Sequence, residues 1–108
     1  MYEAIVVMVM CADSAEAEKI ANAVVEEKLV ACANIAGNVR SFFHWQGALV
    51  RETETLLLMK TRPQCFDELS KRVRQLHSYQ VPEIIALPVV AGSPEYIAWL
   101  RESTVSGE

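Results

Sequence analysis

Long apolar runs and a secretory signal are both missing from this sequence of 108 residues. The longest apolar runs cover residues 4–10 and 56–59, whereas a membrane-spanning helix needs about 18 such residues or more. Tyr2 and Glu3 near the amino terminus lack the basic flank of a signal peptide. These absences argue against a membrane partner, and we expect a soluble, cytoplasmic protein.

The residue patterns that mark most enzymes are absent as well. The four glycines are scattered, so there is no glycine-rich phosphate loop and no dinucleotide-binding fingerprint. Cysteine and histidine do not occur at the CxxC, HxxxH or HExxH spacings of zinc sites, and no aspartate or histidine is placed to activate a serine. We therefore expect that the protein is not an enzyme.

Basic charge and paired cysteines are also scarce. Ten Lys and Arg residues against 14 Asp and Glu residues give a net charge of −4, which argues against a nucleic-acid partner. The three cysteines, Cys11, Cys32 and Cys65, are an odd number at wide spacing. That pattern suits reduced thiols in a reducing compartment better than a disulfide framework.

Apolar side chains, by contrast, are abundant, at 52% of the residues. A chain of 12.1 kDa is too short for two hydrophobic cores, so we expect one domain over residues 1–108. Because a small soluble monomer needs a mostly polar surface, the excess of apolar residues indicates that copies of the chain pack together.

Residues 31–61 form the most distinctive stretch, with two unusually long strands expected at 31–45 and 48–61. A tight turn at Gln46 and Gly47 would join them, although glutamine is a poorer turn residue than asparagine and a longer loop is the alternative. Gly37 and its neighbour predict a bulge inside the first strand. The tight turn would set a register that includes the pairs Trp45–Ala48 and Ser41–Glu52.

This ribbon is too long for its own domain. Strands of about fourteen residues reach on the order of 45 Å, whereas a sphere formed by this chain would be roughly 34 Å across. The overhang carries Phe43, Trp45 and Val50. Because an isolated two-stranded ribbon is marginally stable in water, we expect another copy of the chain to cover these residues.

The remaining elements alternate between strands and helices. An apolar run predicts a strand that is central in a sheet or buried on both faces, Asp13 and Glu16 predict the start of a helix, and Pro63 predicts the start of a second helix. Pro88 belongs at an edge or at a strand end, and Ser93 caps a short last helix. The expected ranges are strands at 3–11 and 83–90 and helices at 13–28, 63–77 and 93–100.

The order of these elements predicts the fold class. It is the α+β, ferredoxin-like β-α-β-β-α-β sandwich, in which both helices cover one face of an antiparallel sheet. Here the sandwich carries a long hairpin between its second and third strands and a short C-terminal helix.

Soft metal ligands occur at the end of the first strand. Met8, Met10 and Cys11 offer thioether and thiolate groups that favour Cu(I), and His77 could bind Cu(II) or Zn(II). The alternative is apolar packing for the sulfur groups and a favourable interaction with the helix dipole for His77.

The connection at residues 77–84 is more polar than a short linker requires. Tyr79, Gln80 and Glu83 could supply a hydroxyl, an amide and a carboxylate to a small ligand pocket. We expect such a cleft where this loop meets Arg40 and Glu52 on the ribbon of a neighbouring copy. The alternative is a rigid connector that fixes the entry into the next strand.

Five short motifs in register resemble the CutA divalent-cation tolerance family across nearly the whole chain. The most specific is the Tyr-Gln-x-Pro-Glu signature at residues 79–83. The others are Ala-Cys-Ala-Asn at 31–34, Trp-Gln-Gly at 45–47, Glu-Thr-Glu at 52–54 and Tyr-Ile-Ala-Trp-Leu at 96–100.

The resemblance implies a PII-like homotrimer in which long ribbons join sheets across subunits, with copper and other divalent-metal binding and a role in the response to metal ions. It makes Cys11 and His77 the candidate metal ligands, because both match family positions. Leu76 replaces a second histidine of some members, and Ser78 replaces the usual proline, so a paired-histidine copper site is absent. The alternatives are a PII-like signalling module with a small ligand between subunits, and a purely structural trimer.

Overall fold

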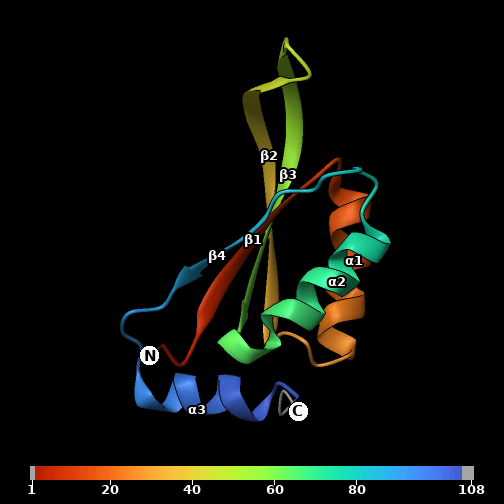
Figure 1. The fold of residues 1–108 in the computed structure, drawn as a ribbon. Helices are drawn as coiled ribbons and strands as arrows, with labels where there is room; N and C mark the ends of the chain where they lie inside the picture. Colours follow the sequence, from red (N-terminus) through yellow and green to blue (C-terminus); the bar gives the residue numbers. More distant parts are fainter. Residues whose placement is uncertain (1, 106–108) are drawn as a thin grey trace.

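A four-stranded antiparallel sheet organises the molecule in this computed structural model, which describes residues 2–105 (Figure 1). The strand order is β2-β3-β1-β4. The strands are β1 (Ile5–Cys11), β2 (Cys32–Trp45), β3 (Ala48–Thr61) and β4 (Ile84–Pro88). The helices are α1 (Ser14–Glu26), α2 (Phe66–Leu76) and α3 (Pro94–Glu102), with a 3-10 turn η1 (Pro63–Cys65) before α2. This arrangement confirms the ferredoxin-like α+β fold.

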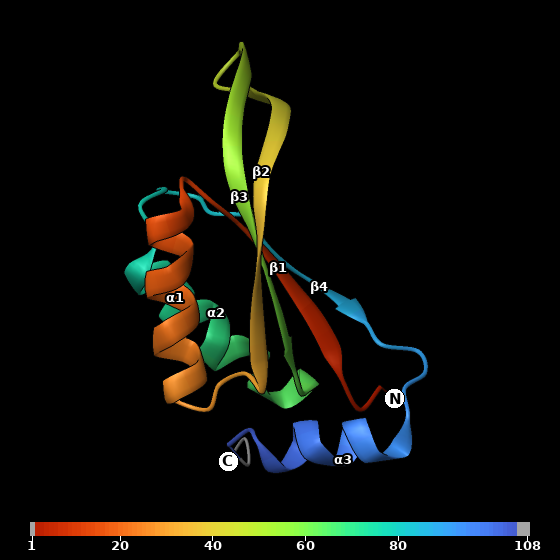
Figure 2. The ribbon, with the colours of Figure 1, turned by 180° about the vertical axis from the view of Figure 1, so that it is seen from behind.

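Helices α1 and α2 lie side by side on one face of the sheet, as the opposite views in Figures 1 and 2 both show. The core lies between these layers. Alternate residues of the strands point into it because strand side chains alternate between the two faces of a sheet. The fully buried members include Val7, Val9 and Cys11 of β1, Leu57 and Met59 of β3, Ile20 and Val24 of α1, and Leu69 and Val73 of α2.

Local chemistry explains most element boundaries. The Asp13 side chain accepts a hydrogen bond from the Glu16 amide at 2.9 Å, which starts α1 as the capping pattern predicts. The helix ends at Glu26, before the expected residue 28, and Lys28 takes a left-handed φ of 60° that helices do not tolerate.

Other expected ranges need correction too, and the last helix extends to Glu102 rather than to residue 100. The second helix does not begin as an α-helix at Pro63, because residues 63–65 form the tighter turn η1. The first strand begins at Ile5 rather than at residue 3. The last strand covers only Ile84–Pro88 of the expected 83–90, and it ends at the proline, whose nitrogen cannot donate to the sheet.

The ribbon of β2 and β3 confirms the expected register. Ser41 pairs with Glu52, and Trp45 pairs with Ala48 across a two-residue turn. Both turn residues have positive φ, 51° at Gln46 and 83° at Gly47, as a tight hairpin of this hand requires. A register shift beside Gly37 confirms the bulge.

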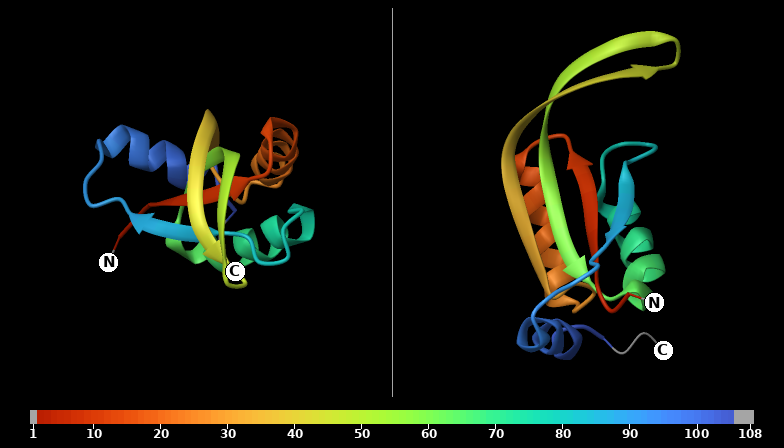
Figure 3. Two further views of the ribbon diagram at one scale, coloured as in Figure 1. Left: turned by 90° about the horizontal axis from the view of Figure 1, so that it is seen from above. Right: turned by 90° about the vertical axis from the view of Figure 1, so that its left-hand side faces the viewer.

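The ribbon extends beyond the rest of the molecule and curves away from the sheet, as the side view in Figure 3 shows. The principal extents of the chain are 44 × 25 × 23 Å. The overhang of the ribbon that the strand lengths predict is therefore present in the single chain.

The sheet face away from α1 and α2 is mostly apolar, although it also holds Lys60 and Asn34, and it carries no helix layer in the views of Figures 1 and 2. The pairing places these side chains on it: Val6, Met8 and Met10 of β1, Leu56 and Leu58 of β3, and Ile85 and Leu87 of β4. Ile85 and Leu87 are 47% and 50% exposed. Among residues 2–105, no helix is long and apolar enough to cross a membrane.

Candidate metal centre and adjoining pocket

Three metal-binding side chains meet where three elements end or begin. Cys11 is the last residue of β1, Glu16 lies in the first turn of α1, and His77 directly follows α2. Their donor atoms all lie within 4.8 Å of one another. The cluster is almost closed to solvent, because Cys11 and the His77 side chain are fully buried and the Glu16 side chain is 11% exposed.

Backbone groups fix the protonation of His77. Its Nε2 lies 2.7 Å from the carbonyl oxygen of Met10, which can only accept, so Nε2 carries the proton. Its Nδ1 accepts a 3.0 Å hydrogen bond from the amide of Tyr79. The ring is therefore neutral. Its Nδ1 lies 3.7 Å from the Glu16 carboxylate, so two electron-pair donors face each other without a proton between them.

Glu16 joins the start of α1 to the loop after α2. Its carboxylate accepts hydrogen bonds from the amide of Ala12 at 2.9 Å and from the amide of Ser78 at 2.7 Å. Burial alone would raise the pKa of Glu16, but the hydrogen bonds from Ala12 and Ser78 lower it below its ordinary value. The carboxylate is therefore charged at neutral pH. A proline at position 78 would lack the N–H that Ser78 donates.

Cys11 keeps its proton in the absence of a cation. Burial raises the pKa of its thiol to about 12, and the negative charges of Glu16, Asp13 and Glu54 act in the same direction. A divalent cation would reverse this balance, because metals bind the thiolate. One thiolate, one carboxylate and a neutral imidazole would then cancel the two positive charges.

The geometry of the cluster fits a metal after a small contraction. Ligand bonds of about 2.0–2.3 Å in a tetrahedral zinc site place the donor atoms roughly 3.5 Å apart. The three donors here span up to 4.8 Å. Coordination through Nδ1 of His77 would also replace its hydrogen bond from Tyr79. The donor types and charges fit a divalent ion, and the 77–79 turn would have to adjust.

A pocket of about 260 Å³ lies next to this cluster, between the ribbon and the loop after α2. Its lining consists of Phe43, Trp45, Val50 and Glu52 from the ribbon and Tyr79, Gln80 and Val81 from the loop. The Tyr79 hydroxyl donates a 2.8 Å hydrogen bond to the buried carboxylate of Glu54. The Tyr79 ring also packs against His77, with ring centroids 4.7 Å apart, so Tyr79 separates the pocket from the metal cluster.

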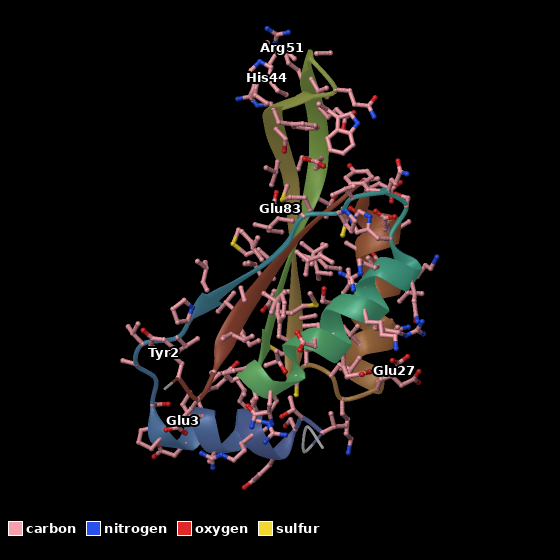
Figure 4. All side chains as sticks on the ribbon, viewed as in Figure 1. Tyr2, Glu3, Glu27, His44, Arg51 and Glu83 are labelled. Atoms are coloured by element: carbon pink, nitrogen blue, oxygen red, sulfur yellow. The ribbon has the colours of Figure 1, made fainter. Side chains whose placement is uncertain are left out.

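The structure sorts the residues expected from the sequence into these two places. Cys11 and His77 come together, and Glu52, Tyr79 and Gln80 share the pocket with the apolar residues of the overhang, Phe43, Trp45 and Val50. Arg40 lies on the opposite face of the ribbon, because its partner is Thr53 whereas Glu52 pairs with Ser41. Glu83 is exposed near the start of β4 and does not line the pocket (Figure 4).

The other soft ligands do not join the cluster. Met8 and Met10 point to the open face of the sheet, whereas Cys11 points to the helix face, because successive strand residues alternate. Leu76, where the resemblance implies a second histidine in some members, packs against the core.

Two site residues were not expected from the sequence. Glu16 was recognised only as part of a helix cap, although a cap directly after Cys11 places the two residues near each other. Glu54 was noted only as part of the Glu-Thr-Glu motif; it is 5% exposed, and nothing in the neighbouring sequence predicts that Tyr79 donates a hydrogen bond to it.

Comparison with known proteins decides the family. The chain matches the family model described as CutA1 divalent ion tolerance protein over residues 5–103. The chain belongs to this family. The divalent-cation tolerance protein CutA of Thermus thermophilus is 48% identical over 99 residues, which cover 92% of this chain and 96% of that protein.

Plant CutA proteins give the same result. The chloroplastic protein CutA of Arabidopsis thaliana is 42% identical over 93% of this chain, and the match spans 55% of the plant protein. The crystal structure of CutA1 from Oryza sativa superposes with a TM-score of 0.94 at 37% identity, covering 97% of this chain and 96% of that one. The resemblance seen in the sequence motifs is thus confirmed.

Proposed function

We propose that this CutA1 chain acts in divalent-cation tolerance by binding a divalent metal ion, copper among them, at Cys11, Glu16 and His77. The observation that carries the proposal is the convergence of these three donors within 4.8 Å in a nearly closed site. Binding, rather than catalysis, is the activity.

The electrostatics of the cluster support the proposal. Without a cation, the charged Glu16 faces a lone pair of His77 at 3.7 Å, which is unfavourable. A divalent ion would neutralise this charge and would release the proton that Cys11 otherwise holds. Sites with nitrogen, oxygen and sulfur ligands bind Cu²⁺ more tightly than Zn²⁺, so copper is the stronger candidate. Zinc has no redox chemistry and is therefore the cleaner probe.

Calorimetric titration with Zn²⁺ tests the site. The Cys11→Ser and His77→Gln variants should each bind at least about tenfold more weakly than the wild type. The glutamine amide can still donate to Met10, so the second variant retains the structural hydrogen bond. Titrations in buffers of different ionisation enthalpy should report release of about one proton at pH 7 from the wild type.

Cys65→Ser is the matched control, because it removes another buried thiol away from the cluster. It should leave the titration unchanged. Identical isotherms for the wild type, Cys11→Ser and His77→Gln would remove these residues from the metal site.

We also propose that the chain works as a homotrimer. The apolar open face of the sheet and the overhanging ribbon both need a cover that a single chain does not supply. Phe43, Trp45 and Val50 lie on the overhang and are the proposed contact residues there, in addition to lining the pocket.

A reducing compartment such as the cytoplasm is the proposed location. All three cysteines are free, although Cys11 and Cys65 lie buried inside the fold. The Arabidopsis relative is named as chloroplastic and a solved structure from Archaeoglobus fulgidus is named as periplasmic, so the names of relatives point to other compartments. Cell fractionation with an antibody against the chain would decide between them.

A further inference from the structure

The pocket beside the metal cluster has a composition that the metal proposal does not explain. Three aromatic rings, those of Phe43, Trp45 and Tyr79, line it together with the carboxylate of Glu52. Aromatic faces carry partial negative charge and attract cations, and the attraction increases when the cation is desolvated. Aromatic rings with one carboxylate are therefore a recognisable environment for an organic cation.

The two faces of the ribbon differ in charge. The pairing Ser41–Glu52 and Val39–Glu54 places both glutamates on the same face as Phe43 and Trp45. The basic residues Arg40, His44 and Arg51 fall on the other face, where their partners are Thr53, Leu49 and Phe42. Figure 4 shows the labelled His44 and Arg51 together at the far end of the ribbon, away from the loop that carries Glu83. The pocket face thus carries only negative charge.

Glu52 is available to a ligand. In the part of the chain that the structure describes, residues 2–105, neither a hydrogen bond nor an ion pair engages its carboxylate. Glu54, by contrast, already accepts the hydrogen bond from Tyr79. Burial, followed by the influence of Glu54 and Glu52, raises the pKa of Tyr79, so the phenol stays neutral and does not compensate the glutamates.

We propose that this pocket binds a small organic cation of the alkylammonium class, with the ammonium group between the aromatic rings and Glu52. The alkyl part would contact the apolar side chains of Val50 and Val81. The volume of about 260 Å³ lies below the roughly 300–1,000 Å³ of sites for drug-sized ligands, so the ligand is small. An anionic ligand such as a nucleotide would be repelled by Glu52 and Glu54.

A matched pair of probes tests the charge requirement. Choline carries a trimethylammonium group, and 3,3-dimethylbutan-1-ol is its uncharged isostere. In calorimetric titrations the wild type should bind choline at least about tenfold more tightly than the isostere. Equal binding of the two probes, or no binding of choline at millimolar concentration, would overturn the proposal.

Two pairs of variants test the residues. Glu52→Gln removes the coulombic attraction of the carboxylate and should weaken choline binding by about tenfold, whereas Glu83→Gln, which changes an exposed glutamate outside the pocket, should not. Phe43→Leu should weaken it by severalfold, whereas Phe42→Leu, on the opposite ribbon face and 64% exposed, should not. Unchanged binding by Glu52→Gln would contradict the assignment.

Two further measurements separate the proposed cation site from the proposed metal site and from the proposed trimer contact. Cys11→Ser should bind choline like the wild type, because Cys11 does not line the pocket. This result would keep the cation site distinct from the metal site. The mass of the protein in solution should be the same with and without choline. A fall in mass on adding choline would show that a second copy of the chain fills the pocket, and it would overturn the proposal.

Discussion

The Tyr79 hydroxyl donates a 2.8 Å hydrogen bond to Oε2 of Glu54, and this contact ties the loop after α2 to the base of the ribbon. On its other side the same tyrosine ring packs against His77, a candidate metal ligand. A single side chain therefore sits between the metal cluster and the aromatic pocket.

Removing this hydroxyl should destabilise the protein. In Tyr79→Phe the carboxylate of Glu54, 5% exposed, loses its donor, which should lower the free energy of unfolding by about 1–3 kcal/mol. Tyr96→Phe is the control, because Tyr96 is 42% exposed and its hydroxyl only approaches Cys32 at 3.7 Å, so its effect should stay within about 0.5 kcal/mol. Urea denaturation at equal protein concentration measures both. Equal losses of unfolding free energy in the two variants would show that the hydrogen bond to Glu54 stabilises the fold no more than the exposed hydroxyl of Tyr96 does.

Stability should fall in alkaline solution, and Cys11 should contribute to the fall. Its pKa rises from an ordinary 9.0 to about 12 in the folded protein, so the folded state holds this proton more tightly than the unfolded state does. The resulting contribution of Cys11 to the free energy of unfolding is complete below pH 9 and is lost as the pH rises towards 12. The slope from one such group is at most about 1.4 kcal/mol per pH unit.

The variant Cys11→Ser should therefore flatten the alkaline part of the profile of unfolding free energy against pH, measured without metal. A residual slope from Tyr79, whose pKa is also raised by burial, should remain. Cys65→Ser removes another buried sulfur and leaves Cys11 in place, so it controls for the loss of a core thiol in the same measurement. A Cys11→Ser profile that parallels the wild type would show that the buried thiol does not titrate in this way.

A charge on the open face of the sheet should disrupt the proposed trimer. Ile85→Glu places a carboxylate at a β4 position that is 47% exposed in the single chain, so folding of the chain should tolerate it. Light scattering after size exclusion should then give a mass near the 12.1 kDa of one chain. Val25→Glu, at a position that is 41% exposed on α1, is the control and should leave the mass near three chains. Assembly of Ile85→Glu like the wild type would exclude this face as the interface.

The turn at the ribbon tip should be sensitive to the loss of glycine. Gly47 has a φ of 83°, and an alanine there should cost about 1 kcal/mol because a Cβ is strained in this conformation. Gly37→Ala is the control, since a Cβ at Gly37 meets no atom within 4 Å and its φ is not in the left-handed region. Urea denaturation should show a loss only for Gly47→Ala. A comparable loss at both positions would mean that the turn conformation is not the cause.

The sequence by itself determined the features that depend on near neighbours. The cap at Asp13, the two-residue turn at Gln46 and Gly47 and the resulting pair of Ser41 with Glu52 were all predictable. Each rests on a backbone conformation or a hydrogen bond within a few residues, so the local pattern contains the information. The same register already implied that Arg40 and Glu52 occupy opposite faces of the ribbon.

Only the tertiary structure decided which of these residues meet. Cys11 and Glu16 are close in the chain, but His77 reaches them because α2 packs beside α1 and ends over the last residues of β1. Tyr79 can donate its hydrogen bond to Glu54 because the loop after α2 passes the base of the ribbon. These meetings depend on how the helices pack on the twisted sheet, which is set by many weak contacts between distant residues, and no single stretch of sequence specifies them.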